Sequence, residues 1–278
     1  MADEVLEKSR LDIGVIRGAL SANILKLISR LDILECVEST NDFVLALAEE
    51  GSHDYMFCIA NKQNSGRGRN GKVWQSPADS NIYMTMGSRF ESASISELGG
   101  LSLACGVAVA RVLEKTGLAP QVKWPNDILL EGRKIAGILV ETRIRSEHIF
   151  VVIGIGLNVN MPAYSAEKIN QPWVDLYGAS STVIDVMERN ALIAKLIDAL
   201  IKCCTEYKQS FFDTFAGDWK RFDALSGRYV VVESETGETQ ARVLGITGDY
   251  ALQVEIEGKE KRLYAADVKL KIDNNVNN

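Results

Sequence analysis

A glycine-rich stretch, Gly66-Arg67-Gly68-Arg69-Asn70-Gly71-Lys72-Val73-Trp74-Gln75-Ser76-Pro77, stands between two segments whose composition predicts β-strands, residues 55–60 and 81–88. The stretch therefore joins one strand to the next. Its glycines let backbone amides approach a ligand closely, and Arg67 and Arg69 add positive charge beside them. We expect a loop that closes over an anionic ligand, with a solvated hairpin tip as the alternative.

Three nucleotide-binding motifs match this loop by spacing, and each fails on its surroundings. The phosphate-loop pattern needs a hydroxyl where Val73 stands, and both it and the dinucleotide pattern need a helix where Trp74 and Pro77 follow. The kinase pattern tolerates strands on both sides, but neither histidine, His53 or His148, opens a His-Arg-Asp catalytic loop. The loop therefore needs another explanation.

Hydrophobic periodicity along the rest of the chain predicts an α+β fold with a mixed sheet. Apolar residues at helical spacing predict helices at residues 13–28, 43–51, 97–116 and 191–222. Strands are expected at residues 31–37, 122–124, 128–130, 134–143 and 148–160. After residues 225–227 the pattern changes to short strands, so we expect a domain boundary near Asp223 and a small all-β domain after it.

The composition excludes several classes of protein. Of the 278 residues, 46% are hydrophobic and 24% are charged, which is ordinary for a folded enzyme. A net charge of −6 without any window dominated by lysine and arginine argues against DNA as a partner. The acidic N-terminus and the lack of a long apolar run predict neither export nor a membrane anchor. Five cysteines without disulfide or zinc spacing predict reduced thiols, no metal ligands among them, and a cytoplasmic protein.

Three further segments combine polar or small residues with strand patterns. The turn Lys123-Trp124-Pro125-Asn126-Asp127 either serves a ligand or simply bonds its own backbone. Lys134 begins an apolar strand, so its ammonium is either held at a wall of the core or keeps a strand edge soluble. Residues 154–160 alternate small and large side chains, which lets a flat ligand approach the strand, although a bulge would use the same residues.

Together these segments resemble the biotin protein ligase family. The family pattern Gly-Arg-Gly-Arg-x-Gly-x-x-Trp-x-Ser-Pro is met by residues 66–77, Lys-Trp-Pro-Asn-Asp by 123–127, Lys-x-x-Gly-Ile-Leu-x-Glu by 134–141 and Ser-Thr-Asn by 39–41. Order and spacing also agree, from about Leu31 to the C-terminus. The departures at Ser65, Asn70 and Lys72 remove no group that the chemistry requires.

The resemblance implies a division into domains. It implies a catalytic domain related to class II aminoacyl-tRNA synthetases over residues 31–222 and a small SH3-like β-barrel over residues 223–272. Residues 1–30 would be a helical lead-in or linker remnant, and residues 273–278 a disordered tail. The residues before the Ser-Thr-Asn segment are too few for the winged helix-turn-helix of the family's bifunctional repressors, so we expect no repressor activity.

The resemblance also implies where the substrates bind. It places the biotin site at Ser39, Thr40, Asn41, Gln63, Arg67, Gly68, Arg69, Lys134, Gly137 and Gly156. It places the ATP site, with Mg²⁺ on the phosphates, at Arg69, Trp74, Asn126, Asp127, Lys134 and Asn158. Cations must bring a carboxylate and a triphosphate together, so the catalytic residues are expected to be Lys134, Arg67, Arg69 and Asp127.

The implied activity is adenylation of biotin, followed by transfer of biotin from biotinyl-5′-AMP to a lysine of a carrier. The carrier would be a biotin carboxyl carrier protein or domain of a biotin-dependent carboxylase such as acetyl-CoA carboxylase. A loop that orders over the intermediate would shield it from water. An exposed strand edge among residues 143–160 would pair with this acceptor or, in a homodimer, with a second copy. Two alternatives stay open: a lipoate ligase, and a biotin sensor or repressor without turnover.

Overall fold

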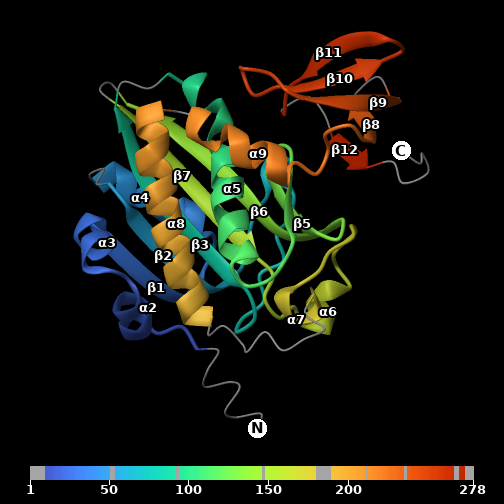
Figure 1. The fold of residues 1–278 in the computed structure, drawn as a ribbon. Coiled ribbons are helices and arrows are strands. Elements are labelled where there is room, and N and C mark those ends of the chain that lie inside the picture. The colour runs from blue at the N-terminus through green and yellow to red at the C-terminus, as the bar shows by residue number, and fades with distance from the viewer. Residues whose placement is uncertain are drawn as a thin grey trace.

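The computed structural model describes residues 10–50, 54–91, 94–145, 148–179, 189–210, 212–234, 237–265 and 269–272. This part of the chain folds around a larger and a smaller β-sheet (Figure 1). The expected tail at residues 273–278 lies outside the described residues, as do the first nine residues of the expected lead-in. Within the described ranges, no helix has both the length and the apolar character needed to cross a membrane.

Seven strands form the larger sheet, in the spatial order β1-β2-β3-β7-β6-β5-β4. They are β1 (Arg30–Val37), β2 (Met56–Gln63), β3 (Ile82–Glu91), β4 (Pro120–Lys123), β5 (Asp127–Leu130), β6 (Arg133–Ile144) and β7 (His148–Leu157). β1 pairs with β2 in parallel, and the other neighbouring strands are antiparallel. The mixed sheet that the sequence predicts is confirmed.

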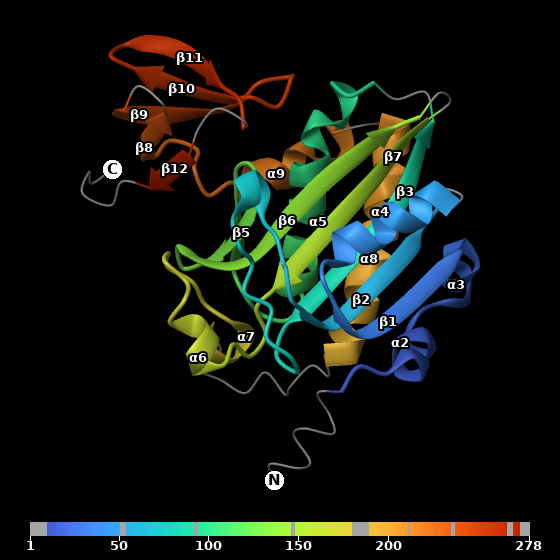
Figure 2. The same ribbon diagram turned by 180° about the vertical axis from the view of Figure 1, so that it is seen from behind.

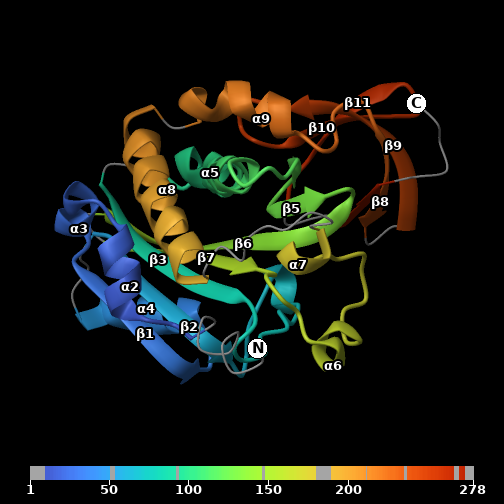
Figure 3. The same ribbon diagram turned by 60° about the horizontal axis from the view of Figure 1, so that its bottom comes forward.

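Helices cover both faces of this sheet. α5 (Leu101–Glu114) and α8 (Arg189–Ser210) lie on one face and α4 (Thr40–Glu50) lies on the other (Figures 1 and 2). Figure 3 shows the same layers from below. α5 is buried on nearly all sides, as its lack of a polar face requires. On the opposite face, Val44 of α4 packs with Phe150 and Val152 of β7. Short helical elements elsewhere in the described residues include η1 (Arg69–Gly71), η2 (Glu97–Gly100), α6 (Ala163–Ala166) and α7 (Leu176–Ala179).

The helical segment predicted at residues 13–28 is confirmed as helical, but it consists of two short helices. They are α2 (Ile13–Ala19) and α3 (Ala22–Leu27). The Ser21 hydroxyl accepts a hydrogen bond from the backbone N–H of Ile24 at 3.3 Å and caps the second helix. Apolar spacing alone does not reveal this interruption, whereas a capping serine does.

The helix predicted at residues 191–222 is also divided. α8 ends at Ser210, and η3 (Asp213–Phe215) leads into α9 (Ala216–Phe222). The ring of Phe212 packs edge-on against Trp219 and against Tyr250, which lies between two strands of the smaller sheet. Aromatic packing between distant segments therefore turns the chain where local periodicity predicts that the helix continues.

The strand edge predicted among residues 143–160 is correct only for residues 143 and 144 at the end of β6, because the rest of the strand in this range is β7. β7 is an inner strand that pairs with β3 on one side and β6 on the other. β5 is shorter than β6 and pairs only with residues 133–137 of it. Residues 139–144 of β6 extend past the end of β5 and so leave an unpaired edge inside the sheet, in addition to the outer strands β1 and β4.

The smaller sheet is antiparallel, with five strands in the order β11-β10-β9-β8-β12. The strands are β8 (Tyr229–Ser234), β9 (Gly237–Ile246), β10 (Leu252–Ile256), β11 (Lys259–Leu263) and β12 (Lys269–Ile272). The all-β character predicted for this region is confirmed. In the described part of the chain, β11 and β12 stand at opposite ends of the sheet and do not pair, so the expected barrel is not closed.

Polar contacts join the two sheets next to the Lys123–Asp127 turn. Lys123 Nζ donates to the carbonyl oxygen of Leu270 at 2.8 Å, and Trp124 Nε1 donates to that of Tyr250 at 3.0 Å. The ring of Tyr250 packs over Gly100, where an added Cβ would lie 2.7 Å from Tyr250 Cε1. The smaller sheet thus helps to position residues that the sequence assigns to the site.

Candidate active site

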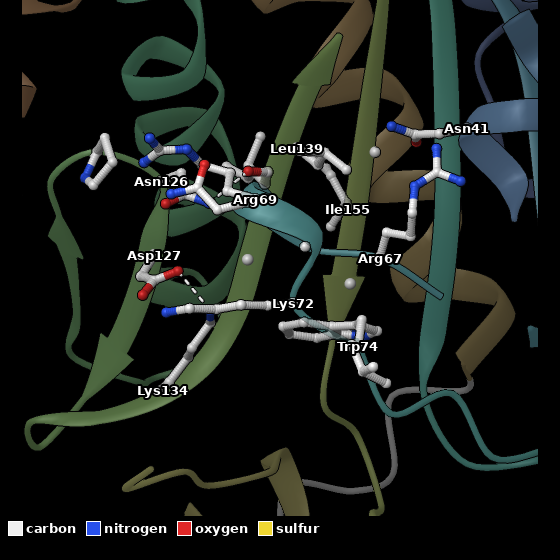
Figure 4. A pocket seen from close by; sticks show the side chains of 18 of the residues that line it. Asn41, Arg67, Arg69, Lys72, Trp74, Asn126, Asp127, Lys134, Leu139 and Ile155 are labelled. Atoms are coloured by element: carbon white, nitrogen blue, oxygen red, sulfur yellow. Dashed lines mark hydrogen bonds and ion pairs between the residues drawn. The ribbon is translucent and has the colours of Figure 1, made fainter. Parts of the chain in front are cut away.

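A cavity of about 200 Å³ lies between the glycine-rich loop and the inner strands β6 and β7 (Figure 4). It is lined by residues from segments 39–41, 63–74, 123–139 and 154–156, together with Gln171 and Leu270. Every site residue predicted from the sequence lines this cavity except Asn158, which lines an adjoining one. The fold therefore brings the four sequence motifs to one place.

Hydroxyl and amide groups form one end of the cavity. Ser39 precedes α4, and its hydroxyl accepts a hydrogen bond from the backbone N–H of Asp42 at 3.4 Å. Gln63 Oε1 accepts hydrogen bonds from the backbone N–H of Thr40 at 2.9 Å and from its hydroxyl at 3.1 Å. Ser39, Thr40 and Asn41 are all buried. These groups offer both donors and acceptors within a small volume.

Glycines make room for the side chains of the cavity wall. An added Cβ at Gly154 would overlap Asn41 Oδ1, and one at Gly156 would overlap the indole of Trp74. At Gly137 the added Cβ would lie 3.1 Å from Trp74 Cζ3. We interpreted these small residues as access for a flat ligand. In the structure, the space beside them is filled by the side chains of Asn41 and Trp74, and the indole of Trp74 forms part of the cavity wall.

The two arginines of the loop have different partners. Arg67 forms a bidentate ion pair with Asp42, with Nη2 2.6 Å from Oδ1, and Nη2 lies 3.7 Å from Glu141 Oε1. Hydrogen bonding to Asp42 raises the pKa of Arg67. Two protein carboxylates therefore balance the charge of Arg67.

Arg69 turns toward the smaller sheet instead. Its Nη2 donates to the carbonyl oxygen of Ala265. Burial lowers the pKa of Arg69, and the nearby charge of Asp127 partly offsets this. Arg69 thus lines the cavity while it contacts the C-terminal region.

Lysines surround Asp127 at the other end of the cavity. Lys134 Nζ lies 2.6 Å from Asp127 Oδ1 and 5.2 Å from the centroid of the Trp74 ring, with 16% of its side chain exposed. The pKa of Lys123 is lowered, mainly by burial and also by the charges of Lys134 and Lys72. The charge of Asp127 partly offsets this shift. Several cations around one carboxylate attract an anionic ligand. Lys123 was missed as a site residue, although it opens the quoted Lys-Trp-Pro-Asn-Asp motif.

Two predicted ligand amides are engaged with the protein backbone. Asn126 Nδ2 donates to the carbonyl oxygen of Ile138 at 2.8 Å, and Asn158 Nδ2 donates to that of Val174 at 3.2 Å. Asn126 thus fastens the turn to β6, 12 residues along the chain, whereas the alternative interpretation expected a bond to the backbone of its own turn. Asn158 fastens the segment that follows β7 to the cavity wall.

A second cavity, of about 380 Å³, adjoins the first across Trp74 and Lys134. Its lining includes Asn158 and three residues that sequence reasoning missed, Lys168, Gln171 and Trp173. No motif marks these three residues. Their segment reaches the site because the backbone N–H of Lys134 bonds to the carbonyl of Pro172 at 3.0 Å and the N–H of Val174 bonds to that of Lys134 at 2.9 Å.

Known proteins have sequences similar to this one. The sequence profile of the biotin/lipoate A/B protein ligase family matches residues 33–158. The bifunctional ligase/repressor BirA of Salmonella typhimurium is 36% identical over 242 residues, which cover 86% of this chain and 73% of that protein. The chain belongs to the biotin protein ligase family. A further relative is the biotin–(acetyl-CoA-carboxylase) ligase of Mycobacterium tuberculosis, 31% identical over 86% of this chain and 88% of that protein.

A solved structure shares the fold. The biotin protein ligase from Aquifex aeolicus, in complex with biotin and ATP, superposes with a TM-score of 0.71 at 24% identity. The match covers 88% of this chain and 100% of that one. The α+β fold expected of the biotin protein ligase family is confirmed.

Proposed function

We propose that this chain is a biotin protein ligase, which makes biotinyl-5′-AMP from biotin and ATP and then transfers biotin to a lysine of a carrier protein. One observation carries the proposal: two unlike sets of side chains converge on one cavity. Hydroxyls and amides gather at residues 39–41 and Gln63, and lysines gather around Asp127. A cyclic urea needs donors and acceptors, whereas a triphosphate needs cations. The related ligases of Salmonella typhimurium and Mycobacterium tuberculosis support the same activity.

In the first half-reaction, the chain must overcome repulsion between a carboxylate and a triphosphate. Lys134 bridges the biotin carboxylate and the α-phosphate, and its contact with Asp127 holds the ammonium in place. The carboxylate oxygen then attacks the α-phosphorus, the bond to the leaving oxygen breaks, and pyrophosphate departs. Arg69 and Lys123 contribute positive charge near this point, and Arg67, whose charge Asp42 and Glu141 balance, contributes N–H donors.

The second cavity suits the nucleoside part of ATP. Trp74 and Trp173 provide aromatic surfaces on which a base stacks, and Asn158 provides an amide beside them. Lys134 lines both cavities, so a ligand that spans them places its phosphates at the lysine. In this arrangement the adenine lies on the far side of Trp74 from the biotin ring.

Mg²⁺ accompanies ATP in this proposal. Protein-bound Mg²⁺ is usually held by substrate phosphates, waters and one or two carboxylates. Within the described ranges, no group of three or more histidine, cysteine or acidic residues could hold a metal. Asp127 is the acidic residue among those that line the first cavity. These residues fit an ion held mainly by the phosphates, which neutralises their charge.

In the second half-reaction, the amine of an acceptor lysine attacks the mixed anhydride and AMP leaves. The acceptor is a biotin carboxyl carrier domain of a biotin-dependent carboxylase such as acetyl-CoA carboxylase, and Asp127 orients its amine. The free edge at residues 139–144 of β6 is available to pair with this domain or with a second copy of the chain. Sedimentation at several concentrations tests the homodimer.

The same proposal excludes DNA as a partner, because a chain with a net charge of −6 lacks the positive charge that phosphate backbones attract. The free thiols of all five cysteines fit a reducing compartment such as the cytoplasm.

The test of this function separates it from its two rivals. The protein is mixed with ATP and either biotin or lipoate, without acceptor, and the products are identified by mass spectrometry. A biotin ligase forms biotinyl-5′-AMP and pyrophosphate. Preferential formation of lipoyl-AMP would show a lipoate ligase, and biotin binding without pyrophosphate release would show a sensor.

A further inference from the structure

Two polar residues stand behind the hydroxyl and amide end of the cavity, and neither of them lines it. Thr85, in the middle of β3, is fully buried, and its hydroxyl oxygen lies 2.7 Å from both Asn41 Oδ1 and Thr40 Oγ1. Glu141 on β6 accepts a hydrogen bond from Asn41 Nδ2 at 2.6 Å. A buried hydroxyl costs free energy unless it is hydrogen bonded. We therefore ask which of its two neighbours the Thr85 hydroxyl bonds.

The chemistry of these groups determines which atom donates. A carboxylate only accepts, so the amide nitrogen of Asn41 must face Glu141 and its oxygen must face Thr85. Thr85 then has to donate its proton to that oxygen. Gln63 Oε1 accepts from the Thr40 backbone and hydroxyl, and its Nε2 donates to Ser76 Oγ at 3.0 Å. The Asn41 and Gln63 amides therefore each have one donor–acceptor orientation. The Thr85 proton goes to Asn41 and the Thr40 proton goes to Gln63, so the 2.7 Å contact between the two hydroxyls has no proton of its own.

Packing keeps these orientations in place. Thr85 pairs across the sheet with Gly154, and the absent side chain of Gly154 leaves the space that the Asn41 amide occupies. The second carboxylate oxygen of Glu141 lies 3.7 Å from Arg67 Nη2. The Asn41 amide is thus held on three sides, and a reversed amide would place its nitrogen against the hydroxyl and its oxygen against the carboxylate.

We propose that Thr85 and Glu141 are positioning residues, which fix the orientation of the Asn41 amide and thereby select a ring with a carbonyl acceptor between two N–H donors. This inference rests on the proposed function and deepens it, because it assigns the selectivity for the urea ring to residues that the ligand does not touch. Without them, the Asn41 amide is free to present either end to the cavity.

The experiment compares Thr85→Val, which removes only the hydroxyl, with Thr85→Ser, which keeps it. Thr205→Val is the matched control, since Thr205 also makes two hydrogen bonds, at 2.8 Å to Ile201 and 2.9 Å to Tyr55, but lies on α8. Glu141→Gln is a second variant that keeps the size of the side chain and removes its acceptor-only character. Calorimetry measures the affinities for biotin, for ATP and for 2-iminobiotin, in which an imine replaces the urea oxygen.

Thr85→Val should weaken biotin binding by roughly 10- to 100-fold, the usual effect of leaving a buried polar group without its partner. The preference for biotin over 2-iminobiotin should narrow in Thr85→Val and in Glu141→Gln, while ATP affinity and Tm stay near those of the starting protein. Thr85→Ser should restore biotin affinity, and Thr205→Val should leave it unchanged.

Two results would overturn the inference. One is wild-type biotin affinity and preference in both Thr85→Val and Glu141→Gln. The other is a parallel loss of biotin affinity, ATP affinity and Tm, which would show a structural role only. A starting protein that binds no biotin would instead overturn the proposed function itself, so the two failures are distinguishable.

Discussion

Replacement of Lys134 by alanine should stop the first half-reaction. Its ammonium lies 2.6 Å from Asp127 Oδ1, lines both cavities, and has only 16% of the side chain exposed. A unit charge about 4 Å from a phosphate oxygen contributes roughly 4 kcal/mol at an effective dielectric constant of about 20. Part of that interaction already exists in the ground state, so we expect the rate of adenylation to fall by about 10²- to 10³-fold, as for loss of one preorganised donor.

The assay is biotin-dependent exchange of labelled pyrophosphate into ATP, which reports adenylation without an acceptor protein. Lys202→Ala is the matched control, because Lys202 forms an exposed pair with Asp198 at 2.7 Å on α8. Exposed pairs of this kind contribute little, so this variant should exchange normally. Undiminished exchange in Lys134→Ala would refute the role assigned to Lys134.

Arg69→Ala should release the biotinyl-5′-AMP intermediate, so that AMP accumulates from biotin and ATP without acceptor. If the variant still retains biotinyl-5′-AMP tightly, the loop does not shield the intermediate. Gly156→Ala should lower the free energy of unfolding in urea by about 1–3 kcal/mol, because the new Cβ overlaps Trp74, and an unchanged midpoint would show that the indole moves freely. Burial raises the pKa of Cys58 to about 12, so this thiol stays protonated at pH 8. Only the exposed Cys36 should therefore react with a thiol reagent. Rapid reaction of further thiols in the folded protein would contradict this packing.

The sequence predicts the chemistry of the site well where short motifs carry it. The glycine-rich loop, the turn at Lys123–Asp127, the strand that begins at Lys134 and the Ser39–Asn41 segment all meet at one cavity. Each motif lies at a strand or helix end, where local patterns are informative. The division of the chain near Asp223 and the assignment of individual residues to biotin or ATP stay predictions.

Other features depend on contacts that no local pattern encodes. Thr85 looks like any threonine in a strand, and only the fold places its hydroxyl between Thr40 and Asn41. The pairing of Arg67 with Asp42 joins residues 25 positions apart, and Trp173 reaches the site through backbone bonds to Lys134. Strand order likewise cannot be read from periodicity, which is why most of the expected free edge fell on β7, an inner strand.

Transfer of labelled biotin to a carrier domain tests the proposed reaction most directly. The protein is incubated with ATP, labelled biotin and a biotin carboxyl carrier domain, with a carrier that lacks its acceptor lysine as control. We expect stable label on the intact carrier only, AMP and pyrophosphate as products, and almost no label when Lys134→Ala replaces the starting protein. Absence of label on the intact carrier, or full labelling by Lys134→Ala, would contradict the proposal that this cavity joins biotin to ATP.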